Sequence, residues 1–246
     1  MSGGPGDHLP TLAGNPLLEE HHRAGPVGRR HPVRQRLVRR YAYGIPNDDA
    51  LEAIASASPA GVVEVGAGTG YWARLLHERG VDVVAYDRWP PGSGGNEYVD
   101  DDSQWFPVWE GDERAVAGHP DRTLLLVWPT WNETWPAEAV AAFYAAGGAT
   151  LVFVGEGPGG LTGDSVLHAQ LGAGGCVACS LGVPDAPCVC DVPVLWRSIR
   201  RVAMPQWADA DDACTVYERV DHATGEPYQR RSSGWLRRSR RPRTMP

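Results

Sequence analysis

Hydrophobic and polar positions follow two different periods along the middle of this chain. Apolar runs of about five residues, rich in Val and Leu, predict buried strands at 61–65, 81–86, 106–110, 123–128 and 149–154. Between them, apolar residues at helical spacing predict helices over 71–79 and 136–146. The run TLLLVW at 123–128 is apolar throughout, which is typical of a central strand in a parallel sheet.

The segments on both sides extend this alternation. Further helices are predicted at 34–43, 48–57 and 165–171, and an antiparallel strand pair at 196–204 and 213–220. Asn47 and Asp164 precede two of these helices and are residue types that cap a helix N-terminus. Strands that alternate with helices predict an α/β fold with a doubly wound, mostly parallel sheet.

The ends of the chain do not show this periodicity. Residues 1–33 are rich in Gly, Pro and His and are predicted to be disordered, as is the basic tail at 229–246. One domain is expected over 34–228, with a Cys-rich insert at 174–191, because 246 residues can bury one sizeable core.

Composition narrows the function classes. All 23 basic residues other than His are Arg, so neither a Schiff-base lysine nor the lysine of a Walker-type phosphate loop is available. The sequence shows neither an apolar run long enough for a bilayer nor a signal-peptide pattern, so we expect a cytoplasmic protein without membrane contact.

Charge is segregated along the chain. Arg residues cluster at 23–40 and at 230–243, whereas the body between them is acidic and the net charge is −7. A basic tail can contact nucleic acid or another anionic partner, but it can equally remain solvated or fold back on the acidic body. The acidic body disfavours a duplex nucleic acid lying across it.

The most informative motif is VVEVGAGTG at 62–70. A β-branched strand with an internal acid, Glu64, runs into a turn spaced by Gly66, Gly68 and Gly70, and a helix and a second strand ending in Asp87 follow. Glycines permit a tight turn and a close approach of the backbone to a ligand. The acid at the tip of the second strand is placed to bind two ribose hydroxyls, so the unit predicts a nucleoside-bearing cofactor.

The spacing E-x-G-x-G-x-G in this motif resembles the first motif of class I S-adenosylmethionine (SAM)-dependent methyltransferases, over residues 60–155. An NAD(P) site or a structural Rossmann turn remains the alternative. The resemblance implies SAM as cofactor and a seven-stranded sheet in the order 3-2-1-4-5-7-6 that ends in an antiparallel hairpin. It also implies that the cofactor is bound by Tyr41, Glu64, Gly66, Ala67, Gly68, Gly70, Tyr71, Trp72, Asp87, Arg88, Asp112 and Trp128.

Within this set, the resemblance assigns the methionine part of SAM to Glu64 and the glycines. It assigns the ribose to Asp87 and the adenine amino group to Asp112, although Asp100, Asp101 and Asp102 lie nearby in sequence. A carboxylate at the strand tip suits the positive amino and sulfonium groups.

The resemblance implies that the substrate side lies after the fourth strand. Trp128 is followed by Pro129, Thr130 and Trp131, which we expect to bind substrate, and Trp135 lies close by. In the superfamily that the motif resembles, enzymes that methylate amino groups of bases carry [DN]-P-P-[YFW] here, and Trp128 replaces the acceptor that would hold an exocyclic amine. Nucleobase N-methylation is therefore in doubt, whereas an aromatic wall that stacks on a flat group or faces a cation fits. Packing under the adjoining helix is the alternative role for these rings.

Two residues are candidates for catalysis. Tyr43 precedes the first core helix, where an N-terminal lid often covers the SAM site in this superfamily, and packing against the sheet is its alternative role. Glu156 follows the fifth strand on a Gly-rich loop and is a candidate general base or a solvated loop residue.

Four thiols cluster in the insert as Cys176-x-x-Cys179 and Cys188-x-Cys190. This spacing predicts a structural tetrahedral zinc site, with reduced free cysteines or disulfides as alternatives. Cys214 stands apart and is predicted to be a buried residue of the last strand.

The sequence therefore predicts a SAM-dependent transferase, most simply one that methylates N or O of a small molecule or peptide. Three alternatives stay open. The first is a SAM cyclase, lyase or 3-amino-3-carboxypropyl transferase, the second a nucleic-acid methyltransferase, and the third a non-catalytic SAM- or zinc-binding interaction protein. Whether the chain forms a homo-oligomer is also open.

Overall fold

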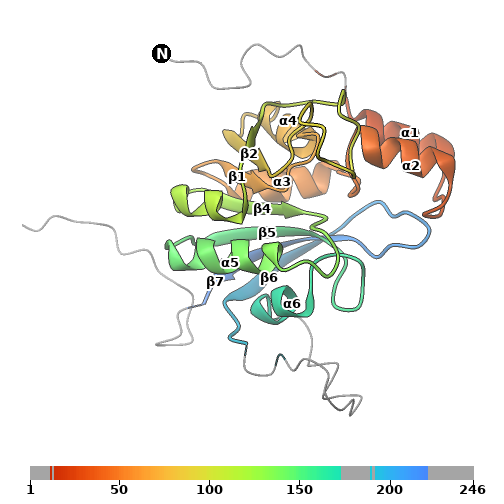
Figure 1. Ribbon diagram of the computed structural model, residues 1–246. Helices are drawn as coiled ribbons and strands as arrows, with labels where there is room; N and C mark the ends of the chain where they lie inside the picture. The colour runs from red at the N-terminus through yellow and green to blue at the C-terminus, as the bar shows by residue number, and fades with distance from the viewer. Residues whose placement is uncertain (1–11, 13, 173–188, 190–191, 221–246) are drawn as a thin grey trace, which may run out of the picture.

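A seven-stranded sheet forms the centre of the molecule (Figure 1). The structure is a computed structural model that describes residues 12, 14–172, 189 and 192–220. The strand order is β3-β2-β1-β4-β5-β7-β6. The strands are β1 (Val62–Val65), β2 (Val83–Asp87), β3 (Val108–Glu110), β4 (Thr123–Val127), β5 (Thr150–Gly155), β6 (Trp196–Ala203) and β7 (Ala213–Arg219). The first five run parallel, β7 pairs antiparallel with β5 and β6, and the predicted fold class and strand order are confirmed.

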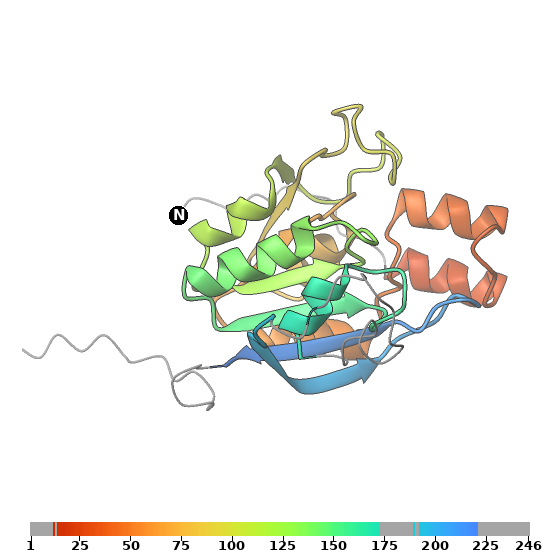
Figure 2. The ribbon, with the colours of Figure 1, turned by 60° about the horizontal axis from the view of Figure 1, so that its bottom comes forward.

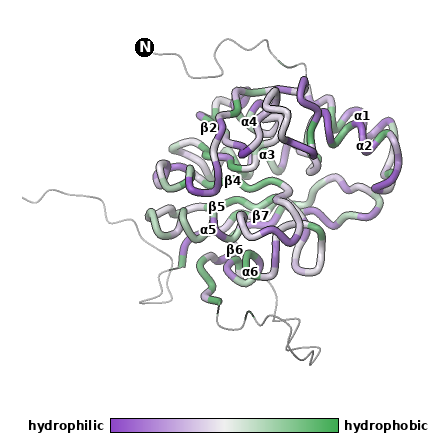
Figure 3. Tube along the Cα trace, viewed as in Figure 1, coloured by the Kyte–Doolittle hydropathy of each residue, from purple (hydrophilic) through white to green (hydrophobic). Residues whose placement is uncertain are grey.

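Helices cover both faces of this sheet, as the two views in Figures 1 and 2 show. On one face lie α3 (Asp48–Ala57) and α4 (Tyr71–His77), and on the other lie α5 (Trp135–Ala145) and α6 (Ser165–Gln170). Alternate residues of β4 supply both cores: Leu125 packs with the first pair, whereas Leu124 and Leu126 pack with the second. A strand buried on both faces has to be apolar throughout, which explains the run at 123–128. Figure 3 shows these apolar stretches at the centre of the sheet.

The N-terminal segment contains a helix that the sequence did not predict. Residues 16–24, within the segment expected to be disordered, form α1 (Pro16–Ala24), and the prediction is corrected there. Asn15 caps the helix by accepting the N–H of Leu18, and Leu17 is fully buried. The helix buries only Leu17 and His21, so its sequence shows almost no apolar periodicity. It lies beside α2 (Pro32–Arg40), and both carry long hydrophilic stretches (Figures 1, 2 and 3).

Several local predictions can be compared with the structure. Asn47 and Asp164 cap α3 and α6 as predicted, and Cys214 is fully buried in β7. The third strand is shorter than predicted, and a 3-10 helix, η1 (Glu113–Gly118), follows it. Among the described residues, no helix is long and apolar enough to cross a membrane.

Candidate cofactor and substrate site

The turn between β1 and α4 brings the backbone to the carboxyl end of the sheet. Gly66 and Gly68 have φ angles of +72° and +54°, which residues with a Cβ rarely adopt. A Cβ on Gly66 would also lie 2.6 Å from Cη2 of Trp135 at the start of α5. Both backbone geometry and close packing therefore require glycine at position 66.

A cavity of about 590 Å³ opens above this turn. It lies at the carboxyl ends of β1, β2 and β4, where ligands bind in open α/β sheets. The loops after these strands and the connection between α2 and α3 form its walls. Most of the predicted site residues line it: Tyr41, Tyr43, Glu64, Gly66, Ala67, Gly68, Trp72, Asp87, Arg88, Asp112, Trp128, Pro129, Thr130 and Trp131.

Glu64 is the most unusual polar group in this cavity. Its carboxyl is almost completely buried, and its Oε2 atom has no hydrogen-bond partner. Burial, followed by the nearby charge of Asp87, raises the pKa of Glu64 to about 8, while the N–H of Ala73 lowers it. A buried acceptor without a partner is costly unless a ligand supplies one.

Asp87 is held in place by the backbone around it. Its Oδ2 accepts the N–H of Gly68 at 2.8 Å, and its Oδ1 accepts the N–H of Trp89 at 2.8 Å. Burial raises the pKa of Asp87, and these two hydrogen bonds oppose the rise. A carboxylate offers about four lone-pair sites, so Asp87 can still accept hydrogen bonds from a ligand.

Asp112 and Arg88 lie at the same edge of the sheet. Asp112 precedes η1 and accepts the N–H of Arg114 at 3.0 Å, so one of its oxygens caps that helix. Arg88 lies 3.6 Å from the carboxylate of Glu113. Both residues line the cavity near Asp87, where the resemblance expects ribose and adenine.

Trp128 and Tyr43 form the inner aromatic wall. Their rings stack with centroids 5.3 Å apart and an interplanar angle of 27°. Trp128 has a φ of +48°, which is uncommon for a residue with a side chain. Its indole N–H donates to Asp212 Oδ1 at 2.7 Å. This strained backbone is therefore held by a specific hydrogen bond.

Asp212 is a residue of the site region that the sequence did not indicate. It is 2% exposed, and its Oδ2 has no partner. Burial raises its pKa to about 7, the hydrogen bond from Trp128 lowers it, and the charge of Glu156 raises it further. It lies in the loop between β6 and β7, whose sequence MPQWADADD contains no recognisable motif for this role.

Three predicted site residues do not line the cavity. Glu156 accepts the N–H of Leu161 at 2.6 Å and that of Asp211 at 3.2 Å, so it joins two loops behind the wall. The hydroxyl of Tyr71 lies 2.8 Å from Asn15 Oδ1 and accepts the N–H of Leu17, which ties α1 to α4. Gly70 lies at the N-terminus of α4 with a φ of +74°. The cysteines Cys176, Cys179, Cys188 and Cys190 lie outside the described residues.

The cavity also contains residues that sequence reasoning missed. Trp89 and Tyr98 come from the loop after β2, and neither residue is assigned a role from the sequence. Glu133 follows β4 and also lines the cavity. The only available signal was the density of aromatic residues in loops, since exposed loop aromatics often belong to binding surfaces.

Comparisons with known proteins give a structural likeness only. No family model matches the chain, and no curated protein sequence matches it. Among solved structures, 1,6-didemethyltoxoflavin-N1-methyltransferase of Burkholderia thailandensis, with S-adenosylhomocysteine (SAH) bound, is similar with 14% identity and a TM-score of 0.44. The match covers 71% of this chain and 78% of that one.

Two further structures are similar to a comparable degree. The N-methyltransferase NodS from Bradyrhizobium japonicum is similar with 13% identity and a TM-score of 0.43, and the match covers 85% of this chain and 100% of that one. Magnesium protoporphyrin IX methyltransferase from Synechocystis PCC 6803 is similar with 10% identity and a TM-score of 0.44, and the match covers 82% of this chain and 93% of that one. These scores are low, and the strand order itself defines the fold as the Rossmann-like fold of class I methyltransferases. The resemblance read from residues 64–70 is thereby confirmed at the level of the fold.

Proposed function

We propose that the cavity binds SAM and that the protein transfers the methyl group to N or O of a small molecule or peptide. The observation that carries this proposal is the buried Glu64 carboxyl, which has an unpartnered oxygen and lies beside Asp87 above the glycine turn. A ligand with a positively charged group and a ribose would satisfy both carboxylates at once. SAM carries both features, so the residues present fit it.

Each part of the cavity then has a distinct task. Glu64 attracts the positive charge of the cofactor, and Asp87 accepts hydrogen bonds from its ribose hydroxyls. Asp112 caps η1 with one oxygen, which leaves its second oxygen to accept the adenine amino group. Tyr41 and Tyr43, on the connection between α2 and α3, cover the cofactor from the N-terminal side. When bound, SAM supplies an electrophilic methyl group.

The protein contributes alignment and exclusion of water to such a transfer. Trp128, Pro129 and Trp131 form the wall against which a substrate would be oriented. Burial raises the pKa of Tyr43, so its phenol stays protonated at neutral pH and acts as a hydrogen-bond donor rather than a base. Glu156 does not line the cavity and accepts two backbone N–H groups, which favours a role in positioning loops.

The test is mass spectrometry of small molecules after incubation of the purified protein with SAM, with and without a metabolite extract. Methyl transfer predicts SAH that appears only with the extract, together with a partner whose mass has increased by one methyl group. Methylthioadenosine above the non-enzymatic background would instead show attack on the aminocarboxypropyl carbon and overturn the proposal. An Asp87→Ala variant controls for contaminating enzymes.

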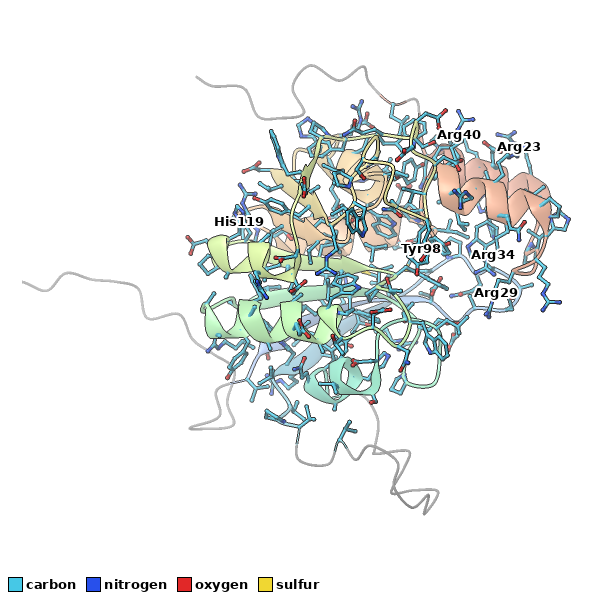
Figure 4. The ribbon with its side chains drawn as sticks, in the orientation of Figure 1. Arg23, Arg29, Arg34, Arg40, Tyr98 and His119 are labelled. Carbon is cyan, nitrogen blue, oxygen red and sulfur yellow. The ribbon has the colours of Figure 1, made fainter. Side chains whose placement is uncertain are left out.

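The nucleic-acid alternative is weakened by the pairing of the N-terminal arginines. On α1, α2 and their connection, five of them lie within 4.0 Å of a carboxylate: Arg23, Arg29, Arg34, Arg36 and Arg39. Figure 4 labels three of these and Arg40. Paired arginines present less free charge to phosphates. Removal of residues 229–246 tests the remaining basic segment, and unchanged activity would exclude a role for that tail in substrate binding.

A further inference from the structure

The opening of the cavity is surrounded by exposed aromatic rings. Trp89, Tyr98 and Trp131 remain 51%, 44% and 60% exposed, although all three line the cavity. We refer to these three side chains as the aromatic mouth. Large aromatic side chains gathered in this way around one opening mark a binding surface, because single exposed rings are normally scattered.

Two loops build the aromatic mouth and approach each other there. Trp89 and Tyr98 follow β2, whereas Trp131 follows β4. The ring of Tyr98, labelled in Figure 4, lies edge-on to Tyr43 with centroids 6.5 Å apart. Burial raises the pKa of Tyr98, and the charges of Glu97 on its own loop and Glu133 on the other raise it further. Carboxylates from both loops therefore lie near the same ring.

The cavity as a whole is strongly acidic. Arg88 is the one basic residue among the described residues that line it, and it lies 3.6 Å from Glu113. The acidic residues that line it are Glu64, Asp87, Glu97, Asp112, Glu113 and Glu133. Glu97 and Glu133 are exposed, and within the described part of the chain no ion pair engages either carboxylate. Their charge therefore remains available to a cation that enters the cavity, although the Glu97 side chain also forms a hydrogen bond with Tyr98.

From this juxtaposition we propose that the substrate is an organic cation with a flat ring system, held by the aromatic mouth and by Glu97 and Glu133. The faces of Trp and Tyr rings attract cations and stack on flat groups. Carboxylates that line a cleft raise the local concentration of cations and repel anions. The inference rests on the proposed function, which assigns Glu64, Asp87 and Asp112 to the cofactor and leaves Glu97 and Glu133 for the substrate.

The test uses three probes of nearly equal shape and different charge. N-methylquinolinium is a cation, quinoline is neutral at pH 7.5, and quinoline-2-carboxylate is an anion. Each is titrated into the full-length protein by calorimetry at low salt, first alone and then with saturating SAH. We expect the cation to bind at least about threefold more tightly than quinoline and the anion not to bind, with the preference shrinking as salt screens the carboxylates.

Two variants and two matched controls locate the site. Trp131→Leu and Glu133→Gln are each expected to weaken cation binding about three- to fivefold, and Glu133→Gln should leave quinoline binding unchanged. Trp109 and Glu110 are exposed residues of β3 that do not line the cavity. Trp109→Leu and Glu110→Gln should therefore leave all three affinities as they are.

The outcomes separate this inference from the proposed function. Tight SAH binding with equal affinity for cation and neutral probe, or with a preference for the anion, overturns the inference and leaves the cofactor assignment intact. Absence of SAH binding overturns the proposed function, whatever the probes show. An equal loss of cation affinity in the β3 controls would place the cation elsewhere and also overturn the inference.

Discussion

Replacing Glu64 by Gln should make the empty protein more stable and its cofactor binding weaker. Burial raises the pKa of this carboxyl from its ordinary value of 4.5 to about 8. Between these two values the native state holds a proton that the unfolded state has released. Stability conferred by the native carboxylic acid therefore falls as pH rises from 4.5 to about 8.

The size of the effect follows from the same shift. Each pH unit in this window costs about 1.4 kcal/mol of unfolding free energy, so the cost at pH 7 is about 3 kcal/mol. Gln has nearly the same shape and no titration, so Glu64→Gln removes this pH dependence. We expect the two proteins to be similar in stability near pH 4.5 and the variant to be more stable by a growing margin up to pH 8.

Binding should change in the opposite direction. The ammonium group of SAH needs the ionised carboxylate of Glu64, so SAH affinity of the wild-type protein should rise by up to about tenfold per pH unit below pH 8. In Glu64→Gln this dependence should be lost, and affinity at pH 8 should fall by on the order of 10- to 100-fold, because a hydrogen bond to a charged group contributes about 1.5–3 kcal/mol.

The assays are urea unfolding and calorimetric titration with SAH between pH 5 and pH 8. Glu52, an exposed residue of α3, supplies the control variant Glu52→Gln, which should follow the wild-type protein in both assays. A stability difference between Glu64→Gln and wild type that does not change with pH would refute the reasoning. So would SAH binding that is unaffected by the substitution.

Three other predictions concern separate parts of the molecule. Asp212→Leu leaves the Trp128 indole N–H without its acceptor and should lower the unfolding free energy at pH 6 by about 1–3 kcal/mol. Asp212→Asn keeps an acceptor oxygen and should retain most of this free energy. Equal losses in both variants, measured by urea unfolding, would contradict the prediction. Gly66→Ala should lower the melting temperature by several degrees and abolish SAH binding, because its Cβ would meet Trp135. Gly118→Ala has open space around it and should change neither property. Scanning calorimetry measures the melting temperature, and titration calorimetry measures SAH binding. Elemental analysis of the purified protein should find one zinc ion per chain. The zinc should be lost when the predicted ligands are substituted and retained in Cys214→Ala. A zinc content below about a tenth of an equivalent per chain would reject the site. The substituted ligands are Cys176, Cys179, Cys188 and Cys190.

The sequence predicted the parts of the fold that depend on local pattern. β4 and β5 are buried on both faces, so their sequences are continuously apolar and their position at the centre could be inferred. β3 is short and largely exposed, which weakens its apolar signal, and its predicted start was two residues too early. The strand order came from the resemblance, because periodicity does not specify which strands are neighbours.

The cofactor side of the site was more accessible to prediction than the substrate side. Glu64, Gly66 and Asp87 lie within one strand–turn–helix–strand unit, so their spacing in sequence reflects their spacing in the structure. Asp212 contacts Trp128 across 84 residues, and nothing in the local sequence of either residue indicates the other. Contacts of this kind depend on how distant loops meet, which a single sequence does not show.

The substrate-side wall is therefore a product of tertiary structure. Trp128 follows β4. Tyr43 from the α2–α3 connection stacks on its ring, and Asp212 from the β6–β7 loop accepts a hydrogen bond from its indole N–H. The same loop supplies Trp207, whose indole N–H donates to the carbonyl of Tyr43 at 2.9 Å. Three segments far apart in the chain thus fix one aromatic surface, whereas Glu64, Gly66 and Asp87 belong to one continuous unit. Changes in the β6–β7 loop should consequently affect substrate binding more than the binding of the cofactor by Glu64 and Asp87.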